Sequence, residues 1–225
     1  MKAKVAVTLA VESLVFVALL FGGAGTLRWT AGWVYLALFF AGALWITARL
    51  ARNDPALLAE RMRSPIQKGQ PLWDKILMPV LMVVWCGWLV LMALDAVRFR
   101  WSAMPVGLQW AGGASMVVAF AMFGRVFREN TFLSAVVKIQ TDRGHRVIST
   151  GPYAIVRHPL YAAMLLYLPA NALLLGSWYG LAASSVLAGC VVFRTAREDR
   201  ELRRSLEGYA EYARRVRYRL IPLVW

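Results

Sequence analysis

Acidic residues, histidine and cysteine are all scarce in this sequence of 225 residues, which has 12 Asp and Glu against 26 Lys and Arg. The two histidines, His145 and His158, are too few for a histidine-rich metal site, and no HExxH motif or Cys/His cluster occurs. Cys86 and Cys190 form no CxxC pair, and each lies in an apolar block, so we interpret both as small buried hydrophobic residues. The sequence therefore predicts no metal.

The motifs of common soluble nucleotide and hydrolase sites are missing as well: there is no GxGxxG, no Walker loop and no GxSxG. The net charge of +14 would suggest a nucleic-acid partner if the protein were soluble. Basic residues of membrane proteins, however, gather in cytoplasmic loops beside anionic headgroups. We therefore expect contacts with membrane lipids and no nucleic-acid partner.

Long apolar blocks are abundant, and 60% of the residues are hydrophobic. Crossing a bilayer takes about 20 apolar residues. Six blocks approach this length, at residues 5–21, 30–47, 76–96, 108–123, 160–175 and 178–193. The predicted fold is an all-α integral membrane protein with about six transmembrane helices. We expect a single membrane domain, 1–225, made of a four-span part at 1–129 and a C-terminal core at 130–225.

The basic residues alternate between loops: six lie in 48–75, six in 124–159 and nine in the tail from Arg194. The intervening loops hold only Arg28, Arg98 and Arg100, whereas Lys2 and Lys4 mark the N-terminus. The positive-inside rule then predicts a multi-pass protein of the cell inner membrane with both termini in the cytoplasm. An aromatic belt at the opposite ends of the spans agrees: Trp29, Trp33, Trp101, Trp110, Trp178 and Tyr179.

Two further local features are predicted. Asp54-Pro55 followed by residues 56–62 favours a short amphipathic helix on the membrane face. Only Gly176 and Ser177 separate the last two blocks, which predicts a tight helical hairpin.

Polar residues cluster just before the fifth block, in the segment 145–161. Gly151-Pro152 predicts a turn, and Pro159 is a good first residue for a helix. Arg157, His158 and Tyr161 then lie at the mouth of that span. The residues alone leave two interpretations open: a functional site, or a topology anchor with an interfacial tyrosine.

A second polar segment follows the sixth block. Arg194, Glu198 and Glu201 are spaced i, i+4 and i+7, so they share one face of a helix. The simpler interpretation is a solvated helix with ordinary ion pairs. The hairpin, however, returns this segment to the surface where the first one lies.

The pattern GPYAIVRHPLY, followed after the hairpin by REDREL and GYAEYARRVRYRLIP, resembles the isoprenylcysteine carboxyl methyltransferase family. The wider relatives of this family include membrane phospholipid methyltransferases, and the resemblance covers about residues 130–222. It implies methyl transfer from S-adenosylmethionine to a lipophilic small-molecule or lipidated acceptor, above all carboxyl O-methylation of an isoprenylcysteine-like substrate. Two departures are Asp199 in place of a second Glu, and Leu206-Glu207 in place of Phe-Gly.

The resemblance also implies residue roles. The stretch that lines the adenine through its backbone matches His145, Val147 and Ile148. The core cofactor motif matches Gly151, Tyr153, Arg157, His158, Pro159 and Tyr161. The acidic pair at the amino-acid end of the cofactor matches Glu198 and Asp199. Arg194 matches the arginine that holds the substrate near the methyl group, so Arg194 and Glu198 are the expected catalytic residues.

Three other functions remain open. A phospholipid or other amine N-methyltransferase would share the cofactor motif. A sterol-type membrane reductase would lack the intact Arg-His-Pro-x-Tyr motif and the acidic pair. A membrane scaffold or small transporter draws support from Glu12, because ionisable groups within spans are functional candidates.

Overall fold

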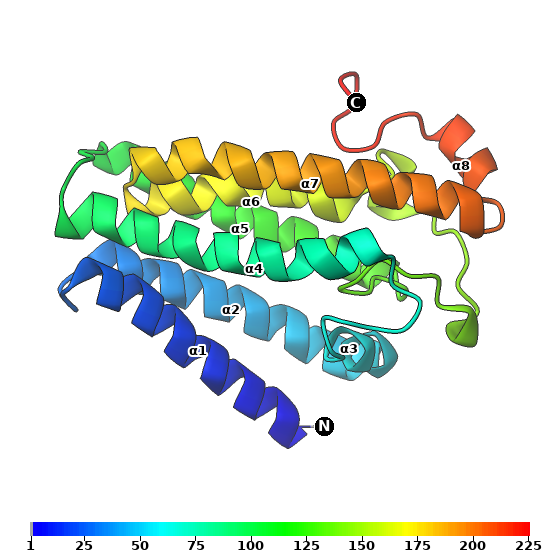
Figure 1. Cartoon of the computed structure of the whole chain (residues 1–225), viewed down its shortest axis with the longest axis horizontal. Helices are drawn as coiled ribbons and strands as arrows, with labels where there is room; N and C mark the ends of the chain where they lie inside the picture. The colour runs from blue at the N-terminus through cyan, green and yellow to red at the C-terminus, as the bar shows by residue number, and fades with distance from the viewer. Residues whose placement is uncertain (1) are drawn as a thin grey trace. The chain divides into compact units, whose positions relative to one another are not determined.

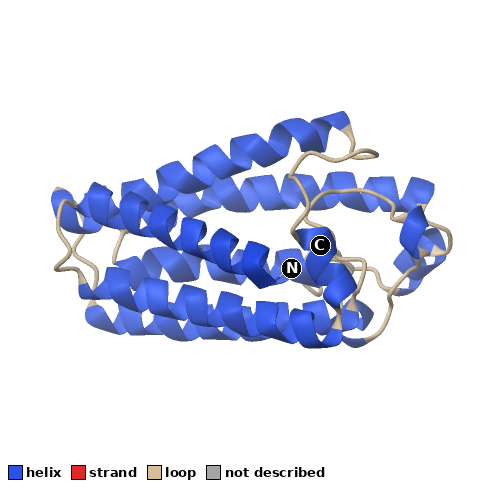
Figure 2. Ribbon diagram, turned by 90° about the horizontal axis from the view of Figure 1, so that it is seen from below, coloured by secondary structure: helices blue, strands red, loops and turns tan. Residues whose placement is uncertain are grey.

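The computed structural model describes residues 2–225, and within them the side chains of all but residues 2–6, 8 and 9. The side chains of Lys2 and Lys4, which belong to the predicted charge pattern, lie outside the described residues. Over 2–225 the regular structure is helical and contains no strand (Figure 2). The predicted all-α class is thereby confirmed.

Six long helices and two short ones follow one another along the chain (Figure 1). The long helices are α1 (Lys2–Ala24), α2 (Thr30–Asn53), α4 (Leu72–Ala93), α5 (Val106–Glu129), α6 (Pro159–Leu175) and α7 (Trp178–Ser205). The short helices are α3 (Pro55–Arg61) and α8 (Tyr209–Arg215). A π-helical turn, Leu94–Arg98, extends α4, and 3-10 turns form at Thr141–Arg143 and Gly151–Ala154.

Four of these helices are long and apolar enough to cross a membrane: Thr30–Asn53, Leu72–Arg98, Val106–Glu129 and Trp178–Ser205. The other two long helices contribute shorter apolar segments: Ala10–Ala24 in α1 and Pro159–Leu175, which is the whole of α6. Five of the six predicted apolar blocks lie within one long helix each, and the block 76–96 lies within α4 and the π-helical turn that extends it. The interpretation of the chain as an integral membrane protein is confirmed.

Local sequence signals explain several helix ends. The Asp54 side chain caps α3 by accepting a hydrogen bond of 2.9 Å from the backbone N–H of Leu57. Pro159 is the first residue of α6, where its missing N–H costs no helical hydrogen bond. Gly176 has φ of +80°, the left-handed conformation that ends many helices. The predicted short helix at Asp54-Pro55 and the predicted hairpin are both present.

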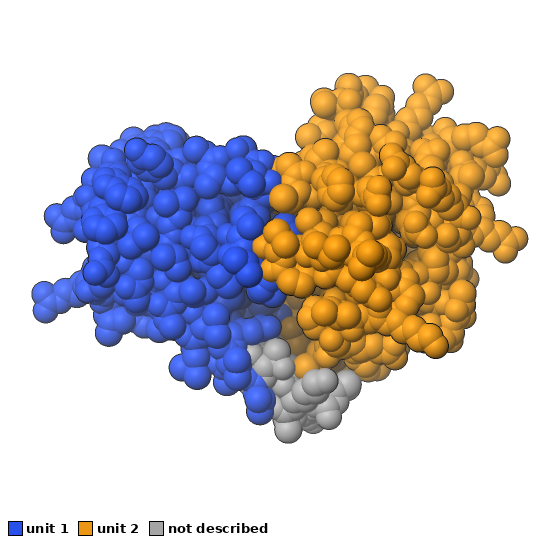
Figure 3. All heavy atoms as spheres, in the orientation of Figure 1, with its two compact units in different colours: residues 1–45, 81–119, 166–188 blue, residues 46–80, 120–165, 189–225 orange. Residues whose placement is uncertain are grey.

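The chain divides into two compact units (Figure 3). Unit 1 contains residues 1–45, 81–119 and 166–188, and unit 2 contains residues 46–80, 120–165 and 189–225. Both units draw residues from α2, α4, α5, α6 and α7.

Unit 1 is built by close helix packing. A side chain at Gly112 of α5 would lie 2.4 Å from the backbone nitrogen of Leu174 in α6, so only glycine permits this approach. The fully buried Asp95 accepts hydrogen bonds from the Ser102 hydroxyl (2.6 Å), the Ser177 hydroxyl and the backbone N–H of Tyr179 (3.2 Å). These bonds fasten the hairpin turn to the end of α4.

Unit 2 has a different core, formed where α7 meets α8. Leu206, Tyr209, Tyr212 and Ala213 are buried together, and Val147 packs against them. The two polar segments singled out in the sequence, 145–161 and 194–202, both belong to this unit.

Candidate functional site

A pocket opens in unit 2 with an empty volume of about 820 Å³, open solvent at its mouth included. Its walls come from residues 130–139, 145–148, 153–161 and 198–212. The lining includes eight of the residues predicted from the sequence: His145, Val147, Ile148, Tyr153, Arg157, His158, Tyr161 and Glu198. Residues from the two polar segments thus meet around one cavity.

Four other predicted residues, Gly151, Pro159, Arg194 and Asp199, do not line this pocket. Gly151 has φ of +56°, and a side chain there would lie 2.8 Å from a carboxylate oxygen of Glu129. The neighbouring Thr150 hydroxyl donates to that carboxylate, so the turn before the motif is pressed against the end of α5. Gly151 and Pro159 therefore shape the backbone that carries the lining residues.

Glu198 and Glu201 are the two acidic residues that line the pocket, and Glu198 is the one bonded to the cofactor motif. Its Oε2 accepts a hydrogen bond of 2.6 Å from the buried Tyr161 hydroxyl. Among the described residues none donates to Oε1, which leaves this oxygen to a ligand. A half-buried carboxylate held in this way can bind a cationic group through a charge-assisted hydrogen bond.

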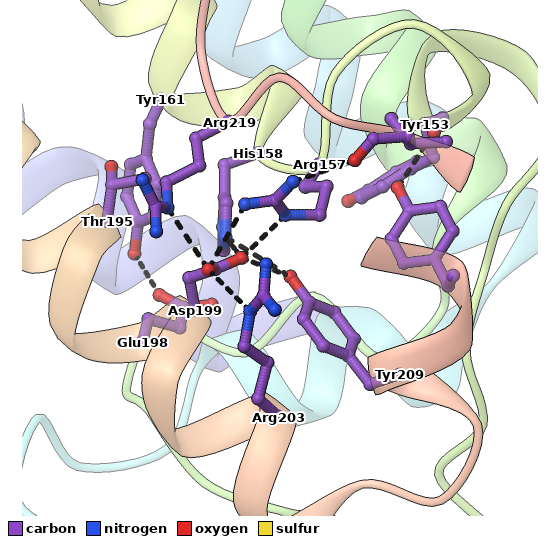
Figure 4. A network of polar contacts seen from close by, with 12 residues as sticks. Tyr153, Arg157, His158, Tyr161, Thr195, Glu198, Asp199, Arg203, Tyr209 and Arg219 are labelled. Atoms are coloured by element: carbon purple, nitrogen blue, oxygen red, sulfur yellow. Dashed lines mark hydrogen bonds and ion pairs between the residues drawn. The ribbon is translucent and has the colours of Figure 1, made fainter. Parts of the chain in front are cut away.

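Asp199, only 1% exposed, is the centre of a network of cations (Figure 4). Arg157 donates to it from Nε at 2.7 Å and Nη2 at 3.2 Å, and Arg203 and Arg219 each donate from Nε at 3.1 Å. The Tyr209 hydroxyl donates to it at 3.0 Å. Burial, and next the charge of Asp199, raise the pKa of Tyr209, so the phenol stays protonated as a donor.

The same network holds the C-terminal segment against the motif. Arg157 donates from Nη1 to the carbonyl oxygens of Val216 (2.7 Å) and Arg217 (2.8 Å). The backbone N–H groups of Arg157 and His158 donate to Tyr218 and Arg219, each at 2.9 Å. In this structure Asp199 and Arg157 thus fix the pocket wall together. Direct contact of Asp199 with a cofactor stays a prediction.

Arg194 is paired with a carboxylate from α4. Its Nε donates to Asp74 at 3.1 Å, and its Nη2 donates to the carbonyl oxygen of Ala135 at 2.8 Å. Its guanidinium carbon lies 5.7 Å from the centre of the Tyr161 ring. Arg194 is therefore held against the ring of Tyr161, the residue that donates to Glu198. Its Nη1 takes part in neither of these two hydrogen bonds.

The segment 130–139 forms a pocket wall that the sequence did not indicate. The buried Glu60 pairs with the Lys138 ammonium at 2.6 Å and accepts a bond of 3.2 Å from Ser134. Arg61 donates to the carbonyl oxygen of Leu133 at 3.1 Å. Helix α3 therefore braces this wall from behind, and the available signal was the charged pair Glu60-Arg61 at the end of an otherwise apolar short helix.

His145 supplies a flat face to the pocket. Its ring stacks on Phe132 with centroids 4.8 Å apart, and its Nδ1 lies 3.3 Å from the backbone N–H of Gln140, which donates to it. Burial, followed by the charge of Arg143, lowers the pKa of His145 to about 4. The imidazole is therefore neutral at pH 7. Groups of three or more metal-binding side chains are absent from the described residues.

Comparison with protein families gives one match. Residues 113–204 match the model described as the isoprenylcysteine carboxyl methyltransferase (ICMT) family. The matched region begins within α5 and ends within α7, so it includes the whole 145–161 motif and Glu198. A search of curated proteins returned no match. The family resemblance noted from the motifs is confirmed over this region.

Proposed function

We propose that the chain is a membrane methyltransferase whose methyl donor is S-adenosylmethionine, because residues 113–204 match the model of the isoprenylcysteine carboxyl methyltransferase family. We propose further that the acceptor is lipophilic and reacts through a carboxylate, as an isoprenylcysteine-like substrate does. The observation that carries the proposal is the pocket of unit 2, in which Glu198 and the 145–161 motif share one cavity. We infer from the charge pattern that this pocket opens to the cytoplasm.

The lining suits the proposed donor. S-adenosylmethionine carries an activated methyl group and its own leaving group, so the protein mainly has to align donor and acceptor. Oε1 of Glu198 is available to hold the donor's ammonium. The stacked pair of Phe132 and His145 and the apolar Val147 and Ile148 offer surfaces for a purine ring.

The protonation states of the lining favour a carboxylate acceptor. A carboxylate with a pKa of about 3.5–4 is ionised at neutral pH and needs no general base. Burial raises the pKa of Tyr153, Tyr209 and Tyr212, so these phenols stay protonated and do not act as bases. Burial lowers the pKa of His145, so its imidazole is neutral. Arg194 keeps Nη1 outside its bonds to Asp74 and Ala135, and this N–H group can meet an anion.

One observation favours a second candidate, amine N-methylation. His158 Nε2 lies 3.3 Å from Asp199, and an imidazole oriented by a carboxylate is an arrangement suited to proton abstraction. An alkylamine, with a pKa of about 10, would need such a base before attack. Carboxyl methylation and amine methylation would use the same methyl donor, so only the chemical identity of the methylated product distinguishes them.

Donor binding is tested by calorimetric titration of the detergent-purified protein with S-adenosylhomocysteine. Glu198→Gln should weaken binding by about 10- to 150-fold, because a hydrogen bond to a charged group contributes about 1.5–3 kcal/mol. Glu207→Gln is the matched control, since Glu207 is an exposed residue near the end of α7 that does not line the pocket. Absence of binding by the wild type would refute the proposed donor.

The acceptor is tested by transfer of a labelled methyl group to a prenylcysteine analogue. A carboxyl methyl ester releases labelled methanol on treatment with base. Arg194→Ala should abolish transfer and change S-adenosylhomocysteine affinity only a few-fold. A base-stable product that migrates with methylated phospholipid would replace the carboxyl acceptor with the amine.

A further inference from the structure

Unit 2 contains a second pocket, where α2 and α5 end. Its empty volume is about 460 Å³, open solvent included. No residue that lines it belongs to the lining of the methyltransferase pocket. It is therefore a separate feature, and the proposed methyl transfer leaves it without a role.

Helical spacing gives this pocket an apolar side and a cationic side. On α2, Ile46 and Leu50 are four residues apart and share one face, and Arg49 and Asn53 form the adjacent row. On α5, Phe127 is buried and Arg128 is exposed, each within one turn of Gly124. Two arginines from different helices thus line one cavity that also has aliphatic and aromatic lining residues.

The pocket lies where the apolar stretches of α2 and α5 end, which is where lipid headgroups are expected. The apolar blocks end at Thr47 in α2 and at Phe123 in α5, and every lining residue except Ile46 follows one of these ends. Basic pockets between transmembrane helices at this depth attract anionic lipid headgroups. Asp54 also lines the pocket, but one carboxylate against two arginines leaves the lining with a net positive charge, and its Oδ1 already caps α3.

We propose that this pocket binds the phosphate of an anionic membrane phospholipid. Arg49 and Arg128 hold the phosphate oxygens from two sides, since a guanidinium offers paired N–H donors in the geometry that phosphate accepts. Ile46, Leu50 and Phe127 contact the start of the acyl chains. A bound lipid would then connect the ends of α2 and α5, the helices that precede α3 and the 130–139 wall.

The test measures lipid retained by the purified protein in native mass spectrometry, with phosphatidylglycerol and phosphatidylcholine supplied in equal amounts. The double variant Arg49→Gln/Arg128→Gln should retain at least tenfold less phosphatidylglycerol than the wild type. Arg52→Gln/Arg125→Gln is the matched control, because it removes the same charge from exposed positions on the same helices outside the pocket. Its retention should stay within twofold of the wild type.

Three outcomes would overturn the proposal: equal losses in the two double variants, equal retention of the two lipids by the wild type, or displacement of phosphatidylglycerol by an equal concentration of glycerol phosphate. The last would mean that a free phosphate compound is the ligand and that the apolar wall is not used. The two wild-type measurements stand even if a variant fails to fold, and thermal unfolding of each variant identifies that case.

Discussion

The two units bury carboxylates in different ways. In unit 1 the buried Asp95 accepts hydrogen bonds from two hydroxyls and one backbone N–H, all neutral donors. In unit 2 each buried carboxylate is paired with a cation: Glu60 with Lys138, Asp74 with Arg194, and Asp199 with Arg157. Removing one member of a buried ion pair leaves the other charge uncompensated. Unit 1 therefore uses a carboxylate to fix a turn, whereas unit 2 uses ion pairs to fix a pocket.

The two units also differ in their content of basic and aromatic residues. Unit 1 contains only five basic residues, Lys2, Lys4, Arg28, Arg98 and Arg100, and all the others belong to unit 2. The six aromatic residues of the predicted outer belt all belong to unit 1. This segregation is what the positive-inside rule and an aromatic belt together produce in a membrane protein.

The largest expected effect is all-or-none labelling of single cysteines by a membrane-impermeant maleimide. Ser64→Cys in unit 2 and Ala103→Cys in unit 1 are both exposed positions and would be made in a background without Cys86 and Cys190. In intact cells Ala103→Cys should react, and Ser64→Cys should react only after the membrane is opened. The reverse pattern would invert the predicted orientation.

The contrast between the buried carboxylates can be tested by paired substitutions. Asp199→Asn leaves Arg157, Arg203 and Arg219 without their common anion, and breaking a buried ion pair costs about 3–5 kcal/mol. Asp95→Asn keeps the size of the side chain, and its hydrogen-bond donors are all neutral. This substitution should lower the free energy of unfolding by about 1–3 kcal/mol. Thermal unfolding in detergent measures both changes, and S-adenosylhomocysteine binding should be lost only in Asp199→Asn. A larger loss of stability in Asp95→Asn would contradict the comparison.

Local patterns predicted a large part of this structure, and long-range pairs account for what they missed. The helices, the hairpin and the short helix after Asp54 follow from hydrophobic patterns and turn residues, and the eight lining residues follow from the family resemblance of the motif. The wall at 130–139 was missed because its partners lie far away in the sequence: Glu60 is 74 residues from Ser134. The pair of Asp74 and Arg194 spans 120 residues.

A smaller effect is expected from Asp74, which connects Arg194 to the pocket wall in unit 2. Asp74→Asn should weaken the bonds to Arg194 and to the backbone N–H of Val137, 3.0 Å away, without removing the side chain. The rate of methyl transfer should fall by about tenfold, because weaker hydrogen bonds to Arg194 should cost about 1.4 kcal/mol of its positioning. The affinity for S-adenosylhomocysteine should change less.

Asp142→Asn is the control for this experiment, because Asp142 is an exposed acid of the same unit that does not line the pocket. A merely structural role for Asp74 would lower transfer and cofactor affinity in parallel. Equal losses in the two assays would therefore exclude Asp74 as a positioning residue for Arg194.

The smallest expected effect concerns acid, and it again belongs to unit 2, which contains both His145 and His158. The pKa of His145 is lowered to about 4 in the folded protein, against about 6.5 for an unperturbed imidazole. Between these values the unfolded chain binds the proton and the folded chain does not. The contribution of His145 to stability is therefore fully present above about pH 6.5 and is lost as the pH falls toward 4.

His145→Gln removes this titration. Relative to the variant, the wild type should thus lose thermal stability between pH 6.5 and pH 4.5, and its S-adenosylhomocysteine affinity should stay constant from pH 6.5 to pH 8. Protonation would also turn Nδ1 from an acceptor into a donor, which breaks its bond from the Gln140 N–H and disturbs the stacked pair with Phe132. A difference between wild type and variant that is independent of pH would show that the pKa of His145 is the same in the folded and unfolded chains, and hence that the imidazole is not buried beside Phe132.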